Sequence, residues 1–373
     1  MNAIPWHPEN KRVAIFLVSL EGGGSERIAL NLAQGFAERG LEVDLVLQRA
    51  TGPYLDQVPD KIRIVDLRAG RMALAIFPLI SYLRRERPPF LLSLMMGANI
   101  IAILSKKLAR VDTRLMISEH LTISVATQNA GSLRGRYLPL LAKRTYPWAD
   151  GIVAVSEGVA EDLAHTIGLP RKEIEVIYNP VVTPELLEKA GEPVDHPWFK
   201  PGEPPVILGV GRLTEQKDFP TLLRAFALVC KERTVRLAIL GEGEDRPQLK
   251  ALVDELGIAE DVDMPGFADN PYGYMAGAAV FALSSRWEGL PTVLIEAMAL
   301  GKPVVATDCP SGAREILNDG RYGTLVPVGD VERLAAGISG MLEHPVEPLP
   351  AWVDRFRPDC TIQAYLKALG CLS

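Results

Sequence analysis

The sequence predicts an α/β protein built from two doubly wound units, each a parallel β-sheet covered by helices. Short apolar runs alternate with helical patterns along most of the 373 residues. A proline-dense stretch at 183–205 interrupts this alternation, which then begins again. A chain of this length can bury a separate core in each half, so we expect two domains of ordinary size.

The first half opens with VAIFLVSL at 13–20, a continuous apolar run typical of a strand covered on both faces. After a glycine turn, a helical pattern places Ile28, Leu32 and Phe36 on one stripe, and Gly40 ends it. Further strands are predicted at 43–48, 91–96, 115–120, 151–156 and 173–180.

The second half repeats the pattern without repeating the sequence. Its strands are predicted at 206–213, 236–243, 262–267, 279–285 and 303–308, with helices at 219–230, 245–257 and from about Pro291. The expected boundaries are an N-terminal domain at 1–185, a linker at 186–205, a C-terminal domain at 206–350 and a tail at 351–373.

The composition is that of a soluble globular protein, since 48% of the residues are apolar and 23% are charged. The most apolar window, 91–104, is shorter than the roughly 18 residues that a membrane helix needs, and we expect a buried strand and helix there. The N-terminus lacks the basic-then-apolar order of a secretory signal, so we expect a cytoplasmic protein. The four cysteines, Cys230, Cys309, Cys360 and Cys371, have neither zinc-ligand nor disulfide-framework spacing.

The charge is unevenly distributed along the chain. A net charge of −6 argues against general nucleic-acid binding, but residues 61–146 carry 15 Lys and Arg against 4 Asp and Glu. Basic and apolar residues alternate there, as in helices that lie on an anionic lipid surface. The segment is predicted either to contact the inner face of a membrane peripherally or to form a solvated basic face.

Two acidic residues in the stretch EGLPTVLIE, Glu288 and Glu296, are the first candidates for chemistry. Pro291 suits a first helical position and Gly301 suits a stop. The amides at the start of such a helix lack intrahelical acceptors and can bind anionic oxygens. Glu288 is then placed to contact a sugar, and Glu296 to accept hydrogen bonds from a ribose diol. The alternative is that both are ordinary structural or surface charges.

Two cations and a glycine turn follow other predicted strands. Arg212 and Lys217 lie on the loop GRLTEQK, where they can hold both phosphates of a diphosphate or simply be exposed. The turn at 22–24 allows a ligand to approach the backbone, but Arg27 stands where a dinucleotide fingerprint needs glycine. The motif at 261–263 spells D-x-D, and we expect it in a surface turn and not at a metal.

Together these motifs resemble the retaining glycosyltransferases of family 4, which have the GT-B fold. The resemblance is carried by EGGGSERIALNLA, GVGRLTEQKDFPTLLRAFA, LGEG, PGF and SSRWEGLPTVLIEAMALGKPVVATDCPSGAREIL, and it extends from Val13 to about Gly340. It implies two Rossmann-like domains facing across a cleft, with a C-terminal helix that crosses back to the first domain.

The resemblance also implies roles for particular residues. Glu288 and His120, which ends the run MISEH, would be catalytic, with His120 near the transferred sugar. A lone histidine after a strand is more often a structural hydrogen-bonding residue, but the carboxyl end of a strand favours a functional one. Arg212 and Lys217 would neutralise the diphosphate, so no metal or other cofactor is expected. The substrate-binding residues would be Gly23, Gly24, Arg212, Lys217, Gly266, Phe267, Ala268, Gly289, Leu290, Thr292 and Glu296.

The function predicted from these features is transfer of a sugar, with retention, from a nucleotide diphosphate, expected to be UDP. The expected acceptor is a lipid-linked saccharide or another cell-envelope glycan. Two alternatives remain open at this stage: a UDP-sugar 2-epimerase of the same fold, and a non-catalytic protein that binds sugar nucleotides.

Overall fold

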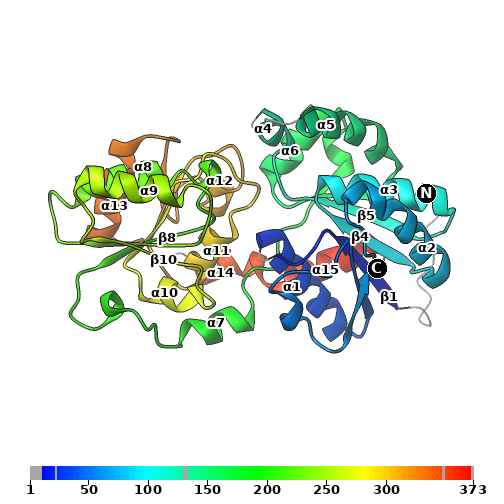
Figure 1. Cartoon of the computed structure of the whole chain (residues 1–373), viewed down its shortest axis with the longest axis horizontal. Helices are drawn as coiled ribbons and strands as arrows, with labels where there is room; N and C mark the ends of the chain where they lie inside the picture. The colour runs from blue at the N-terminus through cyan, green and yellow to red at the C-terminus, as the bar shows by residue number, and fades with distance from the viewer. Residues whose placement is uncertain (1–10, 22, 129–132, 347–348, 371–373) are drawn as a thin grey trace. The chain divides into compact units, whose positions relative to one another are not determined.

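The computed structural model describes residues 11–21, 23–128, 133–346 and 349–370. The N-terminal segment on which the targeting expectation partly rests, and Cys371, lie outside these ranges. The chain divides into two compact units (Figure 1). Unit 1 comprises Met1–Val181 and Phe356–Ser373, and unit 2 comprises Val182–Arg355.

Unit 1 is built on a seven-stranded parallel sheet in the order β3-β2-β1-β4-β5-β6-β7. Its strands are β1 (Arg12–Leu17), β2 (Glu42–Leu47), β3 (Ile62–Asp66), β4 (Phe90–Leu94), β5 (Arg114–Glu119), β6 (Gly151–Ala154) and β7 (Ile174–Val176). The order reverses direction between β1 and β4, which is the arrangement of a doubly wound sheet.

Two layers of helices cover this sheet. The helices are α1 (Gly24–Glu38), α2 (Ile76–Glu86), α3 (Met96–Ala109), α4 (Ile123–Gln128), α5 (Leu133–Thr145), α6 (Glu157–Ile167) and α15 (Pro358–Leu369). α1 packs against α15, while α2, α3, α5 and α6 pack one against the next in a separate layer (Figure 1). The predicted stripe of α1, Ile28, Leu32 and Phe36, is buried, and Gly40 beyond its end has a φ of +80°. The apolar window at 91–104 forms β4 and the start of α3, as expected.

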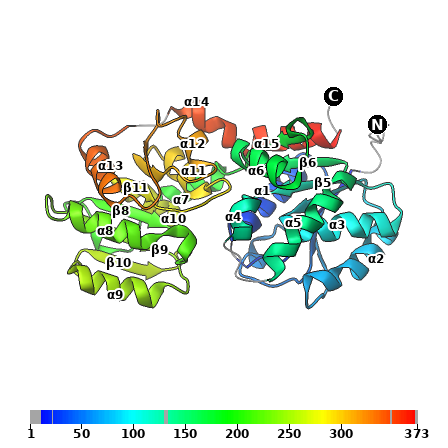
Figure 2. The same cartoon turned by 90° about the horizontal axis from the view of Figure 1, so that it is seen from above.

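Unit 2 has a six-stranded parallel sheet in the order β10-β9-β8-β11-β12-β13 (Figure 2). Its strands are β8 (Val206–Val210), β9 (Arg236–Leu240), β10 (Val262–Gly266), β11 (Val280–Leu283), β12 (Val304–Thr307) and β13 (Thr324–Val326). Its helices are α7 (Pro184–Ala190), α8 (Phe219–Val229), α9 (Arg246–Leu256), α10 (Pro271–Gly277), α11 (Thr292–Ala299), α12 (Ala313–Ile316), α13 (Val331–Glu343) and α14 (Pro350–Val353). The two parallel-sheet units confirm the predicted fold class.

The segment predicted as a linker, 186–205, is instead part of unit 2. Most of α7 lies in it, and α7 packs against α10. His196 is buried, donates from Nε2 to Asp263 at 2.8 Å, and contacts the ring of Tyr274. The prolines mislead because Pro184 and Pro197 occupy the first turns of α7 and a 3₁₀ helix, where proline is favoured.

The turn predicted for the D-x-D motif is correct for Asp261 and wrong for Asp263. Asp263 lies within β10, not in a surface turn, and its carboxylate is the partner of His196. The hydrogen bond between His196 and Asp263 therefore connects the segment 186–205 to β10, which is a structural role.

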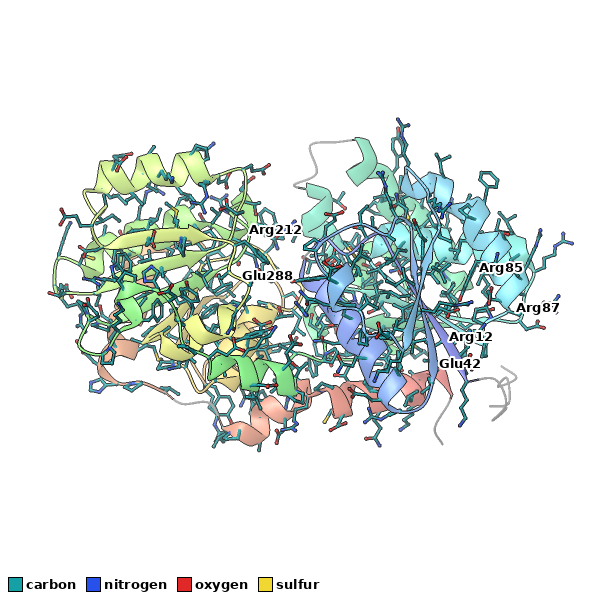
Figure 3. All side chains as sticks on the ribbon, turned by 60° about the horizontal axis from the view of Figure 1, so that its bottom comes forward. Arg12, Glu42, Arg85, Arg87, Arg212 and Glu288 are labelled. Atoms are coloured by element: carbon teal, nitrogen blue, oxygen red, sulfur yellow. The ribbon has the colours of Figure 1, made fainter. Side chains whose placement is uncertain are left out.

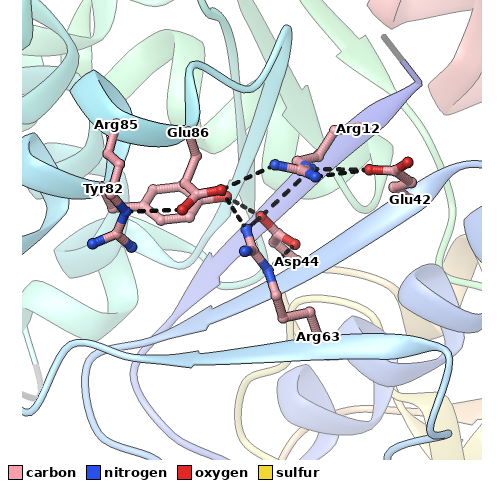
Figure 4. Close-up of polar contacts among 7 residues, drawn as sticks. All are labelled: Arg12, Glu42, Asp44, Arg63, Tyr82, Arg85 and Glu86. Atoms are coloured by element: carbon pink, nitrogen blue, oxygen red, sulfur yellow. Dashed lines mark hydrogen bonds and ion pairs between the residues drawn. The ribbon is translucent and has the colours of Figure 1, made fainter. Parts of the chain in front are cut away.

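The amino ends of β1, β2 and β3 are joined to α2 by a network of charged side chains (Figure 4). The Asp44 carboxylate lies at its centre and is buried. Its Oδ2 receives a hydrogen bond from Tyr82 at 2.6 Å and from Arg63 at 2.5 Å. Arg12 and Arg63 both reach the Glu86 carboxylate, at 3.0 and 2.9 Å. The hydrogen bond to Asp44 raises the pKa of Arg63, and burial raises the pKa of Tyr82.

Candidate active site

Two loops at the carboxyl edge of the unit 2 sheet are locked together. One follows β8 and the other follows β11. Gln216 donates from Nε2 to the carbonyl of Trp287 at 2.9 Å, and the amide of Arg286 donates to the carbonyl of Gln216 at 2.8 Å. Ser284 donates from Oγ to the carbonyl of Lys217 at 2.7 Å. These bonds fix the backbone on either side of Lys217 and Glu288.

Lys217 and Glu288 form an ion pair between these loops. Lys217 Nζ lies 2.6 Å from Glu288 Oε1, and the two side chains are 15% and 8% exposed. Ser285 donates a further hydrogen bond from Oγ to the same oxygen at 2.7 Å. The sequence pointed to a phosphate-binding cation and a sugar-contacting carboxylate, and the structure brings the two into direct contact.

Helix α11 begins directly after this pair. Pro291 was predicted as the first residue of this helix, but it is the N-cap, and the helix begins one residue later at Thr292. Gly301, beyond the end of the helix, has a φ of +70°. Thr292 and Val293 occupy the first turn, where the helix supplies no acceptor for the amides and its dipole favours negative charge. Glu296 lies in the second turn and is half-buried.

A third loop, which follows β12, was missed by the sequence analysis. Ser311 donates from Oγ to the carbonyl of Gly289 at 2.8 Å. A Cβ on Gly312 would lie 2.6 Å from Cδ of Pro291, and Gly312 has a φ of +83°, so only glycine fits there. The same Cβ would lie 3.0 Å from Cα of Leu290, which is buried. The Pro-Ser-Gly sequence after a predicted strand was the available signal.

The remaining residues predicted in unit 2 follow β8 and β10. The Gly266 carbonyl accepts from the amide of Gly241 at 2.8 Å, and Gly266 has a φ of +98°. Phe267 is 60% exposed, and Ala268 is half-buried. The exposed side chain of Arg212 lies on the same side of unit 2 as Glu288 (Figure 3). The residues predicted in unit 2 are therefore on α11, on loops at one edge of its sheet or, for Gly266, at the end of β10.

In unit 1, the predicted glycines begin helix α1. Gly23 precedes the helix and Gly24 is its first residue. A Cβ built on Gly24 would meet no described atom within 4 Å, so packing within the described chain does not require a glycine there. A Cβ on Gly23, in contrast, would overlap with Oε2 of Glu26, so the Glu26 carboxylate lies beside the start of α1.

His120 follows β5 and lies at the carboxyl edge of the unit 1 sheet, the edge at which α1 begins. Its Nε2 lies 3.1 Å from Oγ of Ser118. Burial lowers the pKa of His120 to about 4. The imidazole is therefore neutral at physiological pH, which suits a hydrogen-bonding residue better than a permanent cation.

The residue before His120 was not predicted as functional, yet it is unusual. Glu119 is buried, and its Oε1 accepts hydrogen bonds from the hydroxyl of Tyr146 and from Nδ2 of Asn99, the latter at 2.9 Å. Burial raises the pKa of Glu119 to about 7, against the opposing effect of these hydrogen bonds. A glutamate inside the apolar strand LMISE was the signal in the sequence.

A hollow of about 670 Å³ lies beside β12 and β13, and its lining includes residues of the loops that follow β11 and β12. It is lined partly by Arg286, Arg314 and Arg333. Each of these arginines is paired with an acid: Glu215, Asp308 and Asp330 respectively. Their charges are thus compensated within the protein.

Comparison with known proteins places this geometry in a family. The family described as "Glycosyltransferase Family 4" matches residues 22–184, and "Glycosyl transferases group 1" matches residues 194–355. The chain is 32% identical over 345 residues to the N-acetylgalactosamine-N,N'-diacetylbacillosaminyl-diphospho-undecaprenol 4-alpha-N-acetylgalactosaminyltransferase of Campylobacter jejuni, covering 89% of this chain and 90% of that protein. It is 29% identical to the lipopolysaccharide core biosynthesis glycosyltransferase LpsE of Rhizobium meliloti, over 85% of this chain and 84% of the relative.

Solved structures share the fold at lower identity. Anabaena HepE in complex with UDP-glucose superposes with a TM-score of 0.78 at 21% identity, over 97% of this chain and 100% of the other. WaaG, a glycosyltransferase involved in lipopolysaccharide biosynthesis, gives 0.73 at 18% identity, over 97% and 99%. With two matching family descriptions, a relative at 32% identity over nearly its whole length and paired Rossmann-like sheets, the chain belongs to the family 4 glycosyltransferases of GT-B fold.

Proposed function

We propose that the enzyme transfers a sugar from a UDP-sugar to a hydroxyl of a lipid-linked saccharide or another cell-envelope glycan, with retention of anomeric configuration and without a metal. The observation that carries the proposal is the Lys217–Glu288 pair at the start of α11. It combines a cation, a carboxylate and helix-terminal amides at one edge of the sheet. These are the groups that a glycosyl diphosphate requires.

The residues of unit 2 have separate tasks in this proposal. Lys217 and Arg212 neutralise the diphosphate, which makes it a better leaving group as the bond to the anomeric carbon breaks. The amides at the start of α11 bind phosphate oxygens. Glu288 contacts the sugar, Glu296 accepts from the ribose, and Gly266, Phe267 and Ala268 line the base.

The acceptor class is suggested by the relatives. The C. jejuni protein is named for a diphospho-undecaprenol substrate, and LpsE for the lipopolysaccharide core. In this chain we assign the acceptor to unit 1, whose Gly23 and Gly24 would approach the sugar and phosphate of the donor and whose His120 would contact the transferred sugar. No helix in the described ranges combines the length and the apolarity needed to cross a bilayer.

A basic edge of unit 1 supports peripheral membrane contact at the cytoplasmic face. Helices α2, α3 and α5 precede β4, β5 and β6, so their last turns lie together at the amino edge of the parallel sheet. The basic edge consists of the cations at these helix ends: Arg84, Arg85, Arg87, Lys106, Lys107, Arg110, Lys143 and Arg144. Exposed Leu108 and Trp148 lie among them, and Lys107 Nζ is 3.2 Å from the Trp148 ring centroid. Cations interspersed with apolar side chains suit an anionic lipid surface.

The reaction is tested by incubating the enzyme with a panel of nucleotide sugars and undecaprenyl-linked saccharides, in the presence of a chelator. We expect acceptor-dependent release of UDP and a product whose anomeric configuration, read by NMR, matches the donor. Isomerised nucleotide sugar formed without acceptor would support the epimerase instead. Activity that is lost with chelator and restored by manganese would contradict metal independence.

Replacement of Glu296 by alanine should weaken UDP binding by about 10- to 100-fold, because a charged acceptor of ribose hydrogen bonds is lost. Calorimetry with UDP and with its 2′,3′-dideoxy analogue measures the effect. The wild type should discriminate between them and Glu296→Ala should not. Glu260→Ala, at an exposed position, is the control. If Glu296→Ala discriminates between UDP and the dideoxy analogue as strongly as the wild type does, Glu296 does not bind the ribose.

Reversal of two charges on the basic edge should reduce lipid binding. Each basic residue near an anionic surface contributes about 1 kcal/mol to the free energy of membrane binding. The double variant Arg87→Glu with Arg110→Glu should therefore bind phosphatidylglycerol vesicles more than tenfold more weakly in a co-sedimentation assay. Arg224→Glu with Lys231→Glu, at exposed positions on and just after α8 in unit 2, makes the same change in net charge and should have little effect. If the wild-type protein does not co-sediment with the vesicles even at low salt, the membrane contact is excluded.

A further inference from the structure

The C-terminal helix α15 places a buried hydroxyl beside the strand that carries His120. Tyr365 and Ser118 are 1% and 0% exposed, and Tyr365 Oη lies 3.2 Å from Ser118 Oγ. Ser118 Oγ in turn lies 3.1 Å from Nε2 of His120. Three polar groups therefore form a chain from α15 to the imidazole.

The side chains around Tyr365 hold it in place. Its ring packs edge-on against Phe36 of α1, with the centroids 6.4 Å apart. One turn earlier, Thr361 donates from Oγ1 to the carbonyl of Tyr178 at 2.9 Å. The Tyr365 hydroxyl is thus delivered to Ser118 by a helix that is itself fixed to the body of unit 1.

The direction of the hydrogen bonds follows from counting protons. Within the described residues, Ser118 Oγ is the hydrogen-bond partner of the Tyr365 hydroxyl. A buried hydroxyl needs an acceptor, so Tyr365 donates to Ser118. Ser118 has one proton, and the acceptor that remains for it is Nε2 of His120.

The opposite direction leaves a buried group unsatisfied. If Nε2 carried the proton and donated to Ser118, Ser118 would donate to Tyr365, and the Tyr365 proton would have no acceptor among the described residues. Burial raises the pKa of the Tyr365 hydroxyl to about 12, so this proton is present at neutral pH. The first arrangement satisfies every donor in the chain of bonds, and the second does not.

We infer that Tyr365 and Ser118 are positioning residues that hold His120 as the neutral tautomer with its proton on Nδ1. An isolated neutral imidazole can protonate either nitrogen, and the hydrogen bond at one nitrogen decides the other. The Nδ1–H group is then the donor available to a ligand. The identity of that ligand as the transferred sugar rests on the proposed function, but the tautomer does not.

The tautomer can be measured without substrate, by long-range ¹H–¹⁵N NMR on the full-length protein labelled at histidine. His120→Asn identifies the His120 signals by their loss. We expect protonated Nδ1 and unprotonated Nε2 in the wild type at neutral pH. A protonated Nε2 in the wild type would overturn the inference even if the enzyme transfers sugar as proposed.

Variants separate positioning from simple stabilisation. Ser118→Ala and Tyr365→Phe should each shift His120 toward the Nε2-protonated tautomer and lower kcat by about 10- to 100-fold with little change in donor KM. Thr361→Val removes another buried hydroxyl of α15 and should lower the melting temperature without moving the His120 signals. The inference fails if His120 keeps the same tautomer in Ser118→Ala, or if Thr361→Val shifts it equally.

Discussion

Replacement of Lys217 by methionine is expected to lower kcat/KM for sugar transfer by about 10²- to 10³-fold, the usual cost of removing one preorganised group that stabilises developing charge. Lys217 is mostly buried and Ser284 donates to its carbonyl, so the position of its ammonium group is constrained. Initial rates over a range of donor concentrations, with acceptor saturating, measure the change.

Loss of Lys217 also leaves the buried carboxylate of Glu288 without its cation, so activity alone does not separate catalysis from stability. The double variant Lys217→Met with Glu288→Gln removes both charges and avoids an unpaired buried ion. We expect it to recover most of the thermal stability of the wild type and to remain inactive. A double variant that transfers sugar at the wild-type rate would show that the pair is structural.

Replacement of Asp44 by alanine should lower the free energy of unfolding by about 3–5 kcal/mol, the cost typical of removing one partner from a buried ionic network. Arg63 and Tyr82 both direct their polar groups at Asp44 (Figure 4), and both would be left without this acceptor. Denaturant unfolding followed by circular dichroism measures the loss, with hydrogen exchange locating it to β1, β2 and β3.

Glu42 provides a control within the same network. It accepts from Arg12 at 2.8 Å, but its side chain is 69% exposed. An exposed ion pair contributes about 1 kcal/mol or less to the free energy of unfolding. Glu42→Ala should therefore change this free energy only slightly. If the two alanine variants were equally stable, burial of Asp44 would not be the source of the effect.

The sequence predicted most strands, including the edge strands β7 and β10, and missed the edge strands β3 and β13. β1 and β8 appear as apolar runs because helices cover both faces. β3 was missed because it is an edge strand whose sequence, IRIVD, carries two charges, one of which binds Asp44. β13 has three residues, too few for a pattern to be visible.

The candidate site was predictable in its parts but not in its contacts. Loops after parallel strands meet at one edge, so Lys217 and Glu288 could be assigned to one region. Their direct pairing joins residues 71 positions apart, and no local pattern encodes such a distance. The same applies to Tyr365 and Ser118, which are 247 positions apart. The resemblance implied that the C-terminal helix returns to the first domain, but not which of its side chains would meet Ser118.

The place of α15 has a consequence for synthesis of the protein. Unit 2 is one continuous segment, whereas unit 1 needs Phe356–Ser373 from the end of the chain. A nascent polypeptide can therefore complete unit 2 on the ribosome while the sheet of unit 1 still lacks its final helix. Tyr365 can reach Ser118 only after α15 has been synthesised, so a stop codon within α15 and before Tyr365 would leave unit 2 complete and remove the hydroxyl beside Ser118.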